Sequence, residues 1–106
     1  MIVYEVNVSV SRSIAQDFMA WLPSHVEQVL ASEGFLRAQI LRDTEQDEAE
    51  RLKLTIIYEI ATRAAYERYL QRHAAALRED GLRRFGGSFT ATRRVFQVEQ
   101  TIVAKA

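Results

Sequence analysis

Two histidines are the residues of this chain best suited to acid–base chemistry. His25 lies four residues after Trp21, and His73 lies four residues after Tyr69, so a helix would place both on its apolar face. Imidazole titrates near neutral pH, and each histidine could therefore act as a general base or hydrogen-bond donor in a pocket. The alternative is a packed, hydrogen-bonded histidine at the edge of the core. His25 is the candidate catalytic residue.

Aromatic residues supply a second group of candidates. Tyr4 and Tyr58 occupy inward positions of two predicted strands, where a buried phenol needs a hydrogen-bond partner and could orient a ligand. Trp21 lies on the same helical face as His25 and could cover an aromatic or apolar ligand. Core packing is the alternative, because aromatic residues on inward faces usually form core.

A third group consists of polar residues expected on the opposite face of the predicted sheet: Glu5, Thr55, Glu59 and Arg93. Enclosed charges must be paired or line a wet cavity, so this group could form an intersubunit ion-pair network or hold a polar ligand. Residues 1–62 contain 5 basic and 10 acidic side chains, whereas residues 63–106 contain 9 and 4. This asymmetry is typical of solvated faces of opposite sign, or of an anion site near the C-terminal arginines.

The composition excludes several kinds of chemistry. Cysteine is absent, which removes disulfides, thiolate nucleophiles and sulfur-ligated metals. The two histidines have no carboxylates nearby in sequence, so we predict no metal site, and no dinucleotide or phosphate-loop motif predicts a cofactor. Net charge is zero, and residues 52–60 lack the aromatic and basic residues of an RNA-binding sheet, so no nucleic-acid partner is expected.

Length and composition are those of one globular domain, with 106 residues, 48% apolar and 26% charged. No apolar run approaches the roughly 20 residues of a membrane helix. The first residues lack the basic start and apolar stretch of a signal peptide. We therefore expect no membrane partner and a cytoplasmic location.

Alternating apolar residues predict four strands. They run through about residues 2–10, 35–42, 52–60 and 88–98. The polar, acidic segment 43–51 is predicted to be a mobile hairpin loop. Residues 99–106 are predicted to be a tail that is either strand-like or flexible.

The first helix is predicted between the first two strands. Ser13-Ile14-Ala15-Gln16 has the spacing of a capping box that begins it, and Gly34 supplies its left-handed stop. Pro23 falls inside this helix and costs about 3 kcal/mol in an ordinary helix interior. We predict one bent helix, because the apolar spacing continues through Pro23; the alternative is a break with a restart at Ser24.

The second helix is predicted to begin at the N-cap Thr62, and Asp80-Gly81 is predicted either to close it or to begin a tighter turn. The order strand, helix, strand, strand, helix, strand is the βαββαβ arrangement of the ferredoxin-like fold. We therefore predict a single α+β domain over residues 1–106. Its first and third strands should be central, and two helices should cover one face of an antiparallel four-stranded sheet.

The sheet face away from the helices predicts self-association. It is expected to carry Val3 and Ile57 among polar residues, with Phe35 or Leu41 and Val95 beside them. A wholly solvated face rarely holds such residues, so a homodimer formed through this open sheet face is favoured. A monomer with scattered exposed apolar residues is the alternative. The apolar tail could add a strand across the partner.

Residues along nearly the whole chain resemble a known family. They are the opening Met1-Ile2-Val3-Tyr4-Glu5-Val6, Trp21-Leu22 with His25-Val26, Gly34-Phe35, Tyr69-Leu70 with His73-Ala74, Leu77-Arg78, Gly81-Leu82, Arg84-Phe85-Gly86 and Arg93-Arg94. They resemble an uncharacterised bacterial family, a domain of unknown function in the dimeric α/β-barrel superfamily. The resemblance implies a ferredoxin-like protomer that pairs sheet to sheet. This superfamily includes cofactor-independent monooxygenases, haem-handling enzymes and small ligand-binding modules.

The sequence leaves two functions open. The first is an enzyme or binding protein for a small, partly aromatic or apolar molecule in a cleft between the first helix and the sheet. Its candidate ligand contacts are Trp21, His25, Tyr4, Tyr58, His73 and Arg93. The second is a non-catalytic, dimeric structural or regulatory module.

Overall fold

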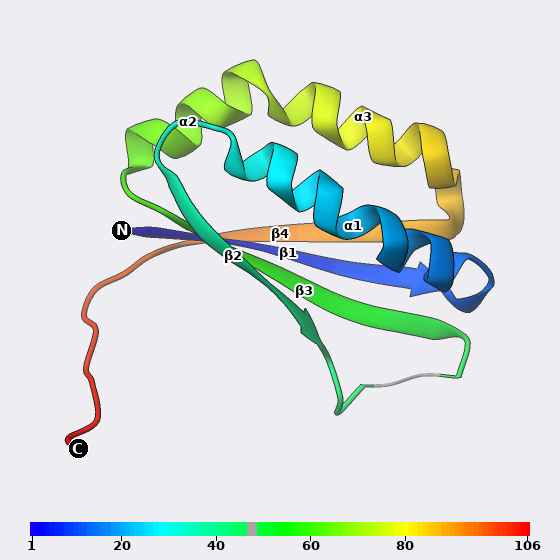
Figure 1. The fold of residues 1–106 in the computed structure, drawn as a ribbon, viewed down its shortest axis with the longest axis horizontal. Coiled ribbons are helices and arrows are strands. Elements are labelled where there is room, and N and C mark those ends of the chain that lie inside the picture. Colours follow the sequence, from blue (N-terminus) through cyan, green and yellow to red (C-terminus); the bar gives the residue numbers. More distant parts are fainter. Residues whose placement is uncertain (47–48) are drawn as a thin grey trace.

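The computed structural model describes residues 1–46 and 49–106 and confirms the α+β, ferredoxin-like architecture. Its antiparallel sheet has the strand order β2-β3-β1-β4 (Figure 1). The strands are β1 (Ile2–Ser11), β2 (Phe35–Arg42), β3 (Arg51–Ile60) and β4 (Phe89–Gln97). The first and third strands are central, as their regular alternation predicts. The predicted loop 43–51 includes Asp47 and Glu48, which lie outside the described residues.

Helices α1 (Ala15–Leu30), α2 (Arg63–Arg72) and α3 (Ala74–Phe85) cover one face of this sheet (Figure 1). The prediction of one second helix with an end or a tighter turn at Asp80-Gly81 is wrong, because two helices lie here and α3 continues through Asp80-Gly81 to Phe85. His73 leaves the helical conformation, with φ −129° and ψ −32°, so α2 ends there and α3 begins with a new phase. In the described part of the chain, no helix combines the length and apolar character required to span a bilayer.

The helix starts decide two capping predictions. The capping box at Ser13-Ile14-Ala15-Gln16 is wrong, because Ser13 lies in a short 3₁₀ turn before α1. Its hydroxyl forms a 2.9 Å hydrogen bond with the hydroxyl of Ser11 instead. The prediction for Thr62 is confirmed, since its hydroxyl accepts a hydrogen bond from the backbone N–H of Ala65 at 3.1 Å.

Helix α1 continues through Pro23, so the alternative of a restart at Ser24 is wrong. Pro23 lies on the exposed side of the helix, where its ring meets solvent. The buried residues of α1 keep one helical phase on both sides of it: Phe18, Leu22, Val26 and Val29. Each fully buried apolar side chain stabilises by about 1.5–3 kcal/mol, which offsets the lost backbone hydrogen bond.

The core lies between the sheet and the helices. Its central part consists of the inward-facing residues of β1 and β3, among them Ile2, Tyr4, Val8, Val10, Leu52, Leu54, Ile56, Tyr58 and Ile60. Gly34 leads from the end of α1 into β2 at φ +85°, which confirms the predicted left-handed position. A Cβ at Gly34 would lie 2.5 Å from the Cβ of Ala65, so glycine also permits α2 to approach.

The opposite face of the sheet, called the open face below, carries half-buried Val3 and Ile57 as predicted. Leu41 lies there as well, because it pairs with Thr55. The placement of Phe35 and Val95 on this face is wrong. The register pairs Phe35 with Ile60 and Val95 with Tyr4, and paired residues of an antiparallel ladder point to the same side, here toward the helices.

Polar residues at the centre of the open face form a hydrogen-bonded network. The Asn7 amide donates to Glu5 at 2.8 Å and accepts from the Thr55 hydroxyl at 2.7 Å. Arg94 donates to the same Glu5 carboxylate at 2.9 Å. The hydrogen bond from Asn7 is the main cause that lowers the pKa of Glu5, so Glu5 is ionised at neutral pH. Arg37 and Glu59 form a further ion pair on this face.

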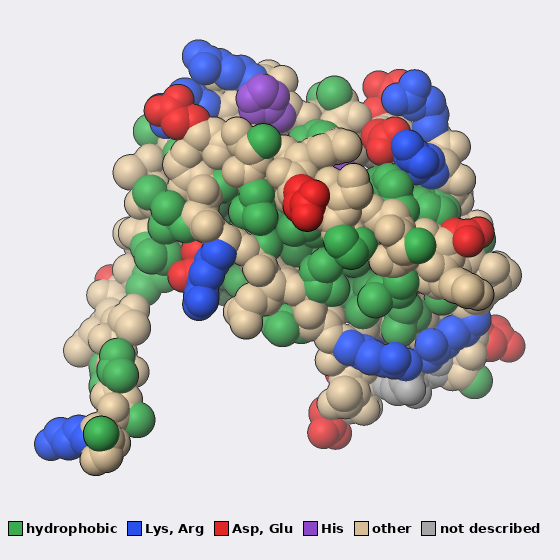
Figure 2. Space-filling view, viewed as in Figure 1, with side chains coloured by type: hydrophobic (Ala, Val, Ile, Leu, Met, Phe, Trp, Pro, Cys, Tyr) green, Lys and Arg blue, Asp and Glu red, His purple; other side chains and the backbone are tan. Residues whose placement is uncertain are grey.

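The chain after β4 is an extended segment without helix or strand over residues 98–106. The Val98 N–H donates to the Met1 carbonyl at 2.9 Å, and the segment then leaves the body of the protein. Apolar side chains stand free along it, including Ile102 and Val103 (Figure 2). No strand of the described chain pairs with this tail.

Candidate functional site

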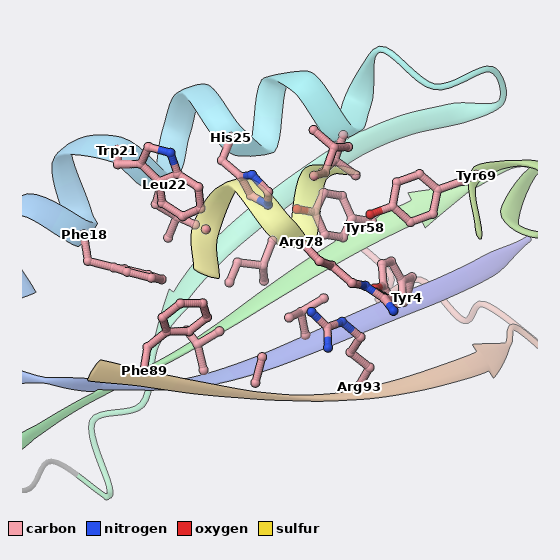
Figure 3. A pocket seen from close by; sticks show the side chains of 17 residues that line it. Tyr4, Phe18, Trp21, Leu22, His25, Tyr58, Tyr69, Arg78, Phe89 and Arg93 are labelled. Atoms are coloured by element: carbon pink, nitrogen blue, oxygen red, sulfur yellow. Dashed lines mark hydrogen bonds between the residues drawn. The ribbon is translucent and has the colours of Figure 1, made fainter. Parts of the chain in front are cut away.

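A cleft lies between α1, α3 and the helix-facing side of the sheet (Figure 3). It leaves about 60 Å³ for the centres of water-sized atoms. A single bound water needs roughly 10–15 Å³ on this measure, so the cleft has room for several waters or a small organic group. Most of its wall is aromatic or aliphatic. The polar residues that line it are His25, Tyr4, Tyr58, Tyr69, Arg78 and Arg93.

Trp21 and His25 form the α1 side of the cleft. Their i, i+4 spacing places them on one helical face, and their rings stack with centroids 4.5 Å apart and planes inclined by 26°. Within the described structure, His25 Nδ1 is buried and has no hydrogen-bond partner. Burial lowers the pKa of His25, a nearby Asp80 opposes this and Arg93 adds to it. His25 is therefore neutral at neutral pH and able to accept a proton.

Tyrosines form the floor and one end of the cleft. Tyr4 from β1 stacks on Tyr58 from the adjacent β3, with ring centroids 5.6 Å apart, and Tyr69 from α2 lies 6.0 Å from Tyr4. Burial raises the pKa of Tyr69 to about 12 and raises the pKa of Tyr58 further. The phenols of Tyr58 and Tyr69 are therefore neutral hydrogen-bonding groups at physiological pH.

Arg93 reaches the cleft from β4, which corrects its predicted place on the open face. The register pairs Arg93 with Val6 and Arg94 with Glu5, so the two neighbouring arginines project to opposite sides of the sheet. Arg93 shares the helix-facing side with Phe89, Ala91 and Val95.

His73 does not belong to this cleft, and the prediction that it sits on a buried helical stripe is wrong. That prediction assumed one continuous helix, whereas His73 is the residue at which α2 ends and α3 begins. Its side chain is exposed and lines a separate surface depression with Gln28 and Arg72. The cleft therefore brings together five of the six predicted contacts, namely Tyr4, Trp21, His25, Tyr58 and Arg93.

Arg78 and Gly81 are among the residues of the cleft that sequence reasoning missed. Arg78 enters from α3, and its Nη2 donates to the Tyr4 hydroxyl at 3.1 Å, while its buried Nε has no hydrogen-bond partner in the described structure. Gly81 lies one turn later, buried against Trp21. The available signal is helical spacing, because Arg78 and Gly81 fall in the stripe that Ala74 and Phe85 define.

Comparison with protein families identifies the chain. Residues 1–99 match the family described as a domain of unknown function, DUF4286. The chain belongs to this family. No curated protein matches it, so neither comparison assigns an activity to this DUF4286 chain.

Solved structures similar to this DUF4286 chain share its fold. A candidate antibiotic biosynthesis monooxygenase from Deinococcus radiodurans is 15% identical, with a TM-score of 0.78 and coverage of 100% of both chains. SnoaB, a cofactor-independent oxygenase from Streptomyces nogalater, is 20% identical, with a TM-score of 0.67 and coverage of 95% of this chain and 96% of that chain. A dimeric ferredoxin-like protein from an uncultured marine organism is 15% identical, with a TM-score of 0.66 and coverage of 98% and 100%.

The chemistry available to this DUF4286 chain follows from the cleft. Aromatic rings can hold a planar ligand, His25 can accept a proton, and two guanidinium groups can stabilise negative charge. Within residues 1–46 and 49–106, no three histidine or carboxylate side chains converge closely enough to hold a metal ion.

Proposed function

We propose that this DUF4286 protein binds or transforms a small, partly aromatic or apolar molecule in the cleft between α1 and the sheet. The observation that carries this proposal is a pair of buried polar atoms, His25 Nδ1 and Arg78 Nε, that lack partners on the wall of an aromatic cleft. A buried polar group without a partner costs about 1–3 kcal/mol. A bound ligand or ordered water that meets these atoms would remove that cost.

The names of the structural neighbours support a small-molecule function. SnoaB is a cofactor-independent oxygenase, and the protein from Deinococcus radiodurans is a candidate antibiotic biosynthesis monooxygenase. A cofactor-independent reaction depends on side chains that move protons, and the neutral His25 beside Trp21 is suited to act as a general base toward a ligand stacked in the cleft. His25 is therefore our candidate for the catalytic residue.

We further propose that the working unit is a homodimer joined through the open face. Val3, Ile57 and Leu41 give this face an apolar component, and exposed Phe96 on β4 extends it. In the central network, Glu5, Asn7, Thr55 and Arg94 are hydrogen-bonded to one another, which lowers the desolvation cost of covering them with a second sheet. Dimeric ferredoxin-like proteins among the neighbours support the same assembly.

A non-catalytic dimeric module is the second candidate function. The observation in its favour is the stacking of His25 on Trp21, because ring packing alone accounts for a histidine at this position. In that case the cleft would contain only water, and His25 would matter for stability alone.

Native mass spectrometry of the protein, purified gently from its source organism, tests both the assembly and the cleft. We expect a dimer that retains a small molecule. A His25→Ala variant should keep the dimer and lose the retained molecule, whereas His73→Ala, which changes an exposed histidine, should behave as the wild type. An empty wild-type dimer would favour the module, and an empty monomer would refute the assembly as well.

A further inference from the structure

Arg78 and Arg93 are two cations in one cleft without an acidic partner. Several other arginines of the described chain have carboxylate partners, for example Arg84 with Asp80 at 3.2 Å and Arg94 with Glu5 at 2.9 Å. Arg78 has a single hydrogen bond in the described structure, to the Tyr4 hydroxyl, and Arg93 has none among the described residues. The cleft wall contains no aspartate or glutamate.

The two guanidinium groups act on the same part of the cleft. Arg78 projects from α3 and Arg93 from β4, and their side chains converge near Tyr4 (Figure 3). Both lower the pKa of Tyr69, although burial outweighs them and the net shift is upward. The phenols of Tyr58 and Tyr69 therefore stay protonated and supply no negative charge to balance the two cations.

Such an arrangement is unfavourable in an empty cleft, because like charges repel and a buried guanidinium nitrogen lacks its hydrogen bond. An anion placed between the two groups would reverse both effects. The planar guanidinium fork matches a carboxylate in particular, since it offers two parallel N–H donors. Most of the remaining wall is aromatic or aliphatic, with Trp21, Phe18 and Phe89 at the other end of the cleft.

We propose that the ligand of this cleft is an aromatic carboxylate, whose ring lies against Trp21 and His25 and whose carboxylate is held between Arg78 and Arg93. This inference rests on the proposed function and specifies its ligand class. Arg78, fixed by Tyr4 inside the cleft, sets the position of the carboxylate. Arg93, exposed at the mouth, completes its charge neutralisation.

Matched pairs of probes with equal shape and different charge test this inference on the full-length protein. Suitable pairs are benzoate with benzamide and 2-naphthoate with 2-naphthamide. Trp21 is the only tryptophan of the chain and lies in the cleft, so its fluorescence reports binding directly. We expect each acid to bind about tenfold more tightly than its amide, because a hydrogen bond to a charged group contributes more than a neutral one.

Variants assign that preference to the two arginines. Arg93→Gln should reduce the affinity for the acids about tenfold and leave the amides unchanged. Arg78→Gln should act in the same way. If Arg78→Gln fails to fold because its hydrogen bond to Tyr4 is lost, Arg93→Gln still tests the assignment. Arg83→Gln is the matched control, because it removes an exposed arginine of α3 that lies neither in the cleft nor on the open face.

The outcomes separate this inference from the proposed function. Equal binding of acid and amide would overturn the carboxylate assignment and leave an aromatic-binding cleft in place. Inorganic phosphate that competes as well as benzoate would also overturn it, because the site would then recognise a bare anion. Failure of every acid and amide to bind would overturn the proposed function together with the inference.

Discussion

Gly81 lies in the middle of α3 and is buried, yet it adopts an ordinary helical conformation that any residue could take. A Cβ built at this position would lie 3.2 Å from Cη2 of Trp21 and 3.5 Å from Cζ of Phe89, both in the wall of the cleft. Alanine is favoured over glycine in a helix interior by about 0.8–1.0 kcal/mol. The chain therefore forgoes helix stability at a position where a methyl group would crowd Trp21 and Phe89.

For the Gly81→Ala variant, we expect the free energy of unfolding to stay equal to the wild type or rise by up to about 1 kcal/mol. The 3.2 Å contact requires a shift of a few tenths of an ångström, and Trp21 has the cleft on one side into which it can move. The added methyl group stands in the cleft itself. Binding of aromatic probes should therefore weaken about tenfold, the loss expected when a misplaced methyl disturbs about 1.4 kcal/mol of contacts.

Urea denaturation followed by circular dichroism measures the stability, and Trp21 fluorescence titration measures the binding. Gly86→Ala is the control: Gly86 has φ +56° and no atom within 4 Å of its added Cβ. It should lose about 1–2 kcal/mol through backbone strain and leave binding unchanged. A Gly81→Ala protein that is destabilised by more than about 1 kcal/mol and still binds the probes normally would refute the reasoning. Gly81 would then serve the close packing of α3 against Trp21.

Two further predictions concern stability. Burial lowers the pKa of His25 in the folded state, so between this pKa and the unfolded value of about 6.5 the unfolded chain binds more protons, and stability should fall as pH falls through that window. Urea titrations from pH 8 to 5 should show this loss in the wild type and in His73→Gln but not in His25→Gln. If the free energy of unfolding of His25→Gln falls with pH as steeply as that of the wild type, the loss belongs to other groups. Thr62→Ala should destabilise the protein by about 1 kcal/mol, because the hydrogen bond that caps the Ala65 N–H is lost. Thr62→Ser keeps a hydroxyl at this position and should retain most of the stability that the cap contributes. Equal stability of the two variants in thermal denaturation would show that the cap contributes nothing.

The sequence was sufficient to predict the sheet because period-two alternation over β1 and β3 fixes both the strands and the face that each side chain takes. The same alternation, with helical spacing in α1, brought Tyr4, Tyr58, Trp21 and His25 to one cleft. The prediction of one continuous second helix failed for a local reason. A single non-helical residue, His73, resets the phase, and no glycine or proline near it signals a break.

The failure at Arg93 has a different cause and bears on function. Sequence reasoning assigns Arg93 and Val95 both to the open face, which reverses the phase of β4, because a strand that carries apolar and charged residues on both faces shows no clear alternation. In the structure, Arg93 lies on the helix-facing side with Phe89, Ala91 and Val95, and its charged group lines the cleft. On the same strand, Arg94 faces the other way and is neutralised by Glu5. Strand β4 therefore places one arginine beside a carboxylate and the next arginine in the cleft beside Arg78. In the cleft, a ligand can supply the negative charge that the two cations lack.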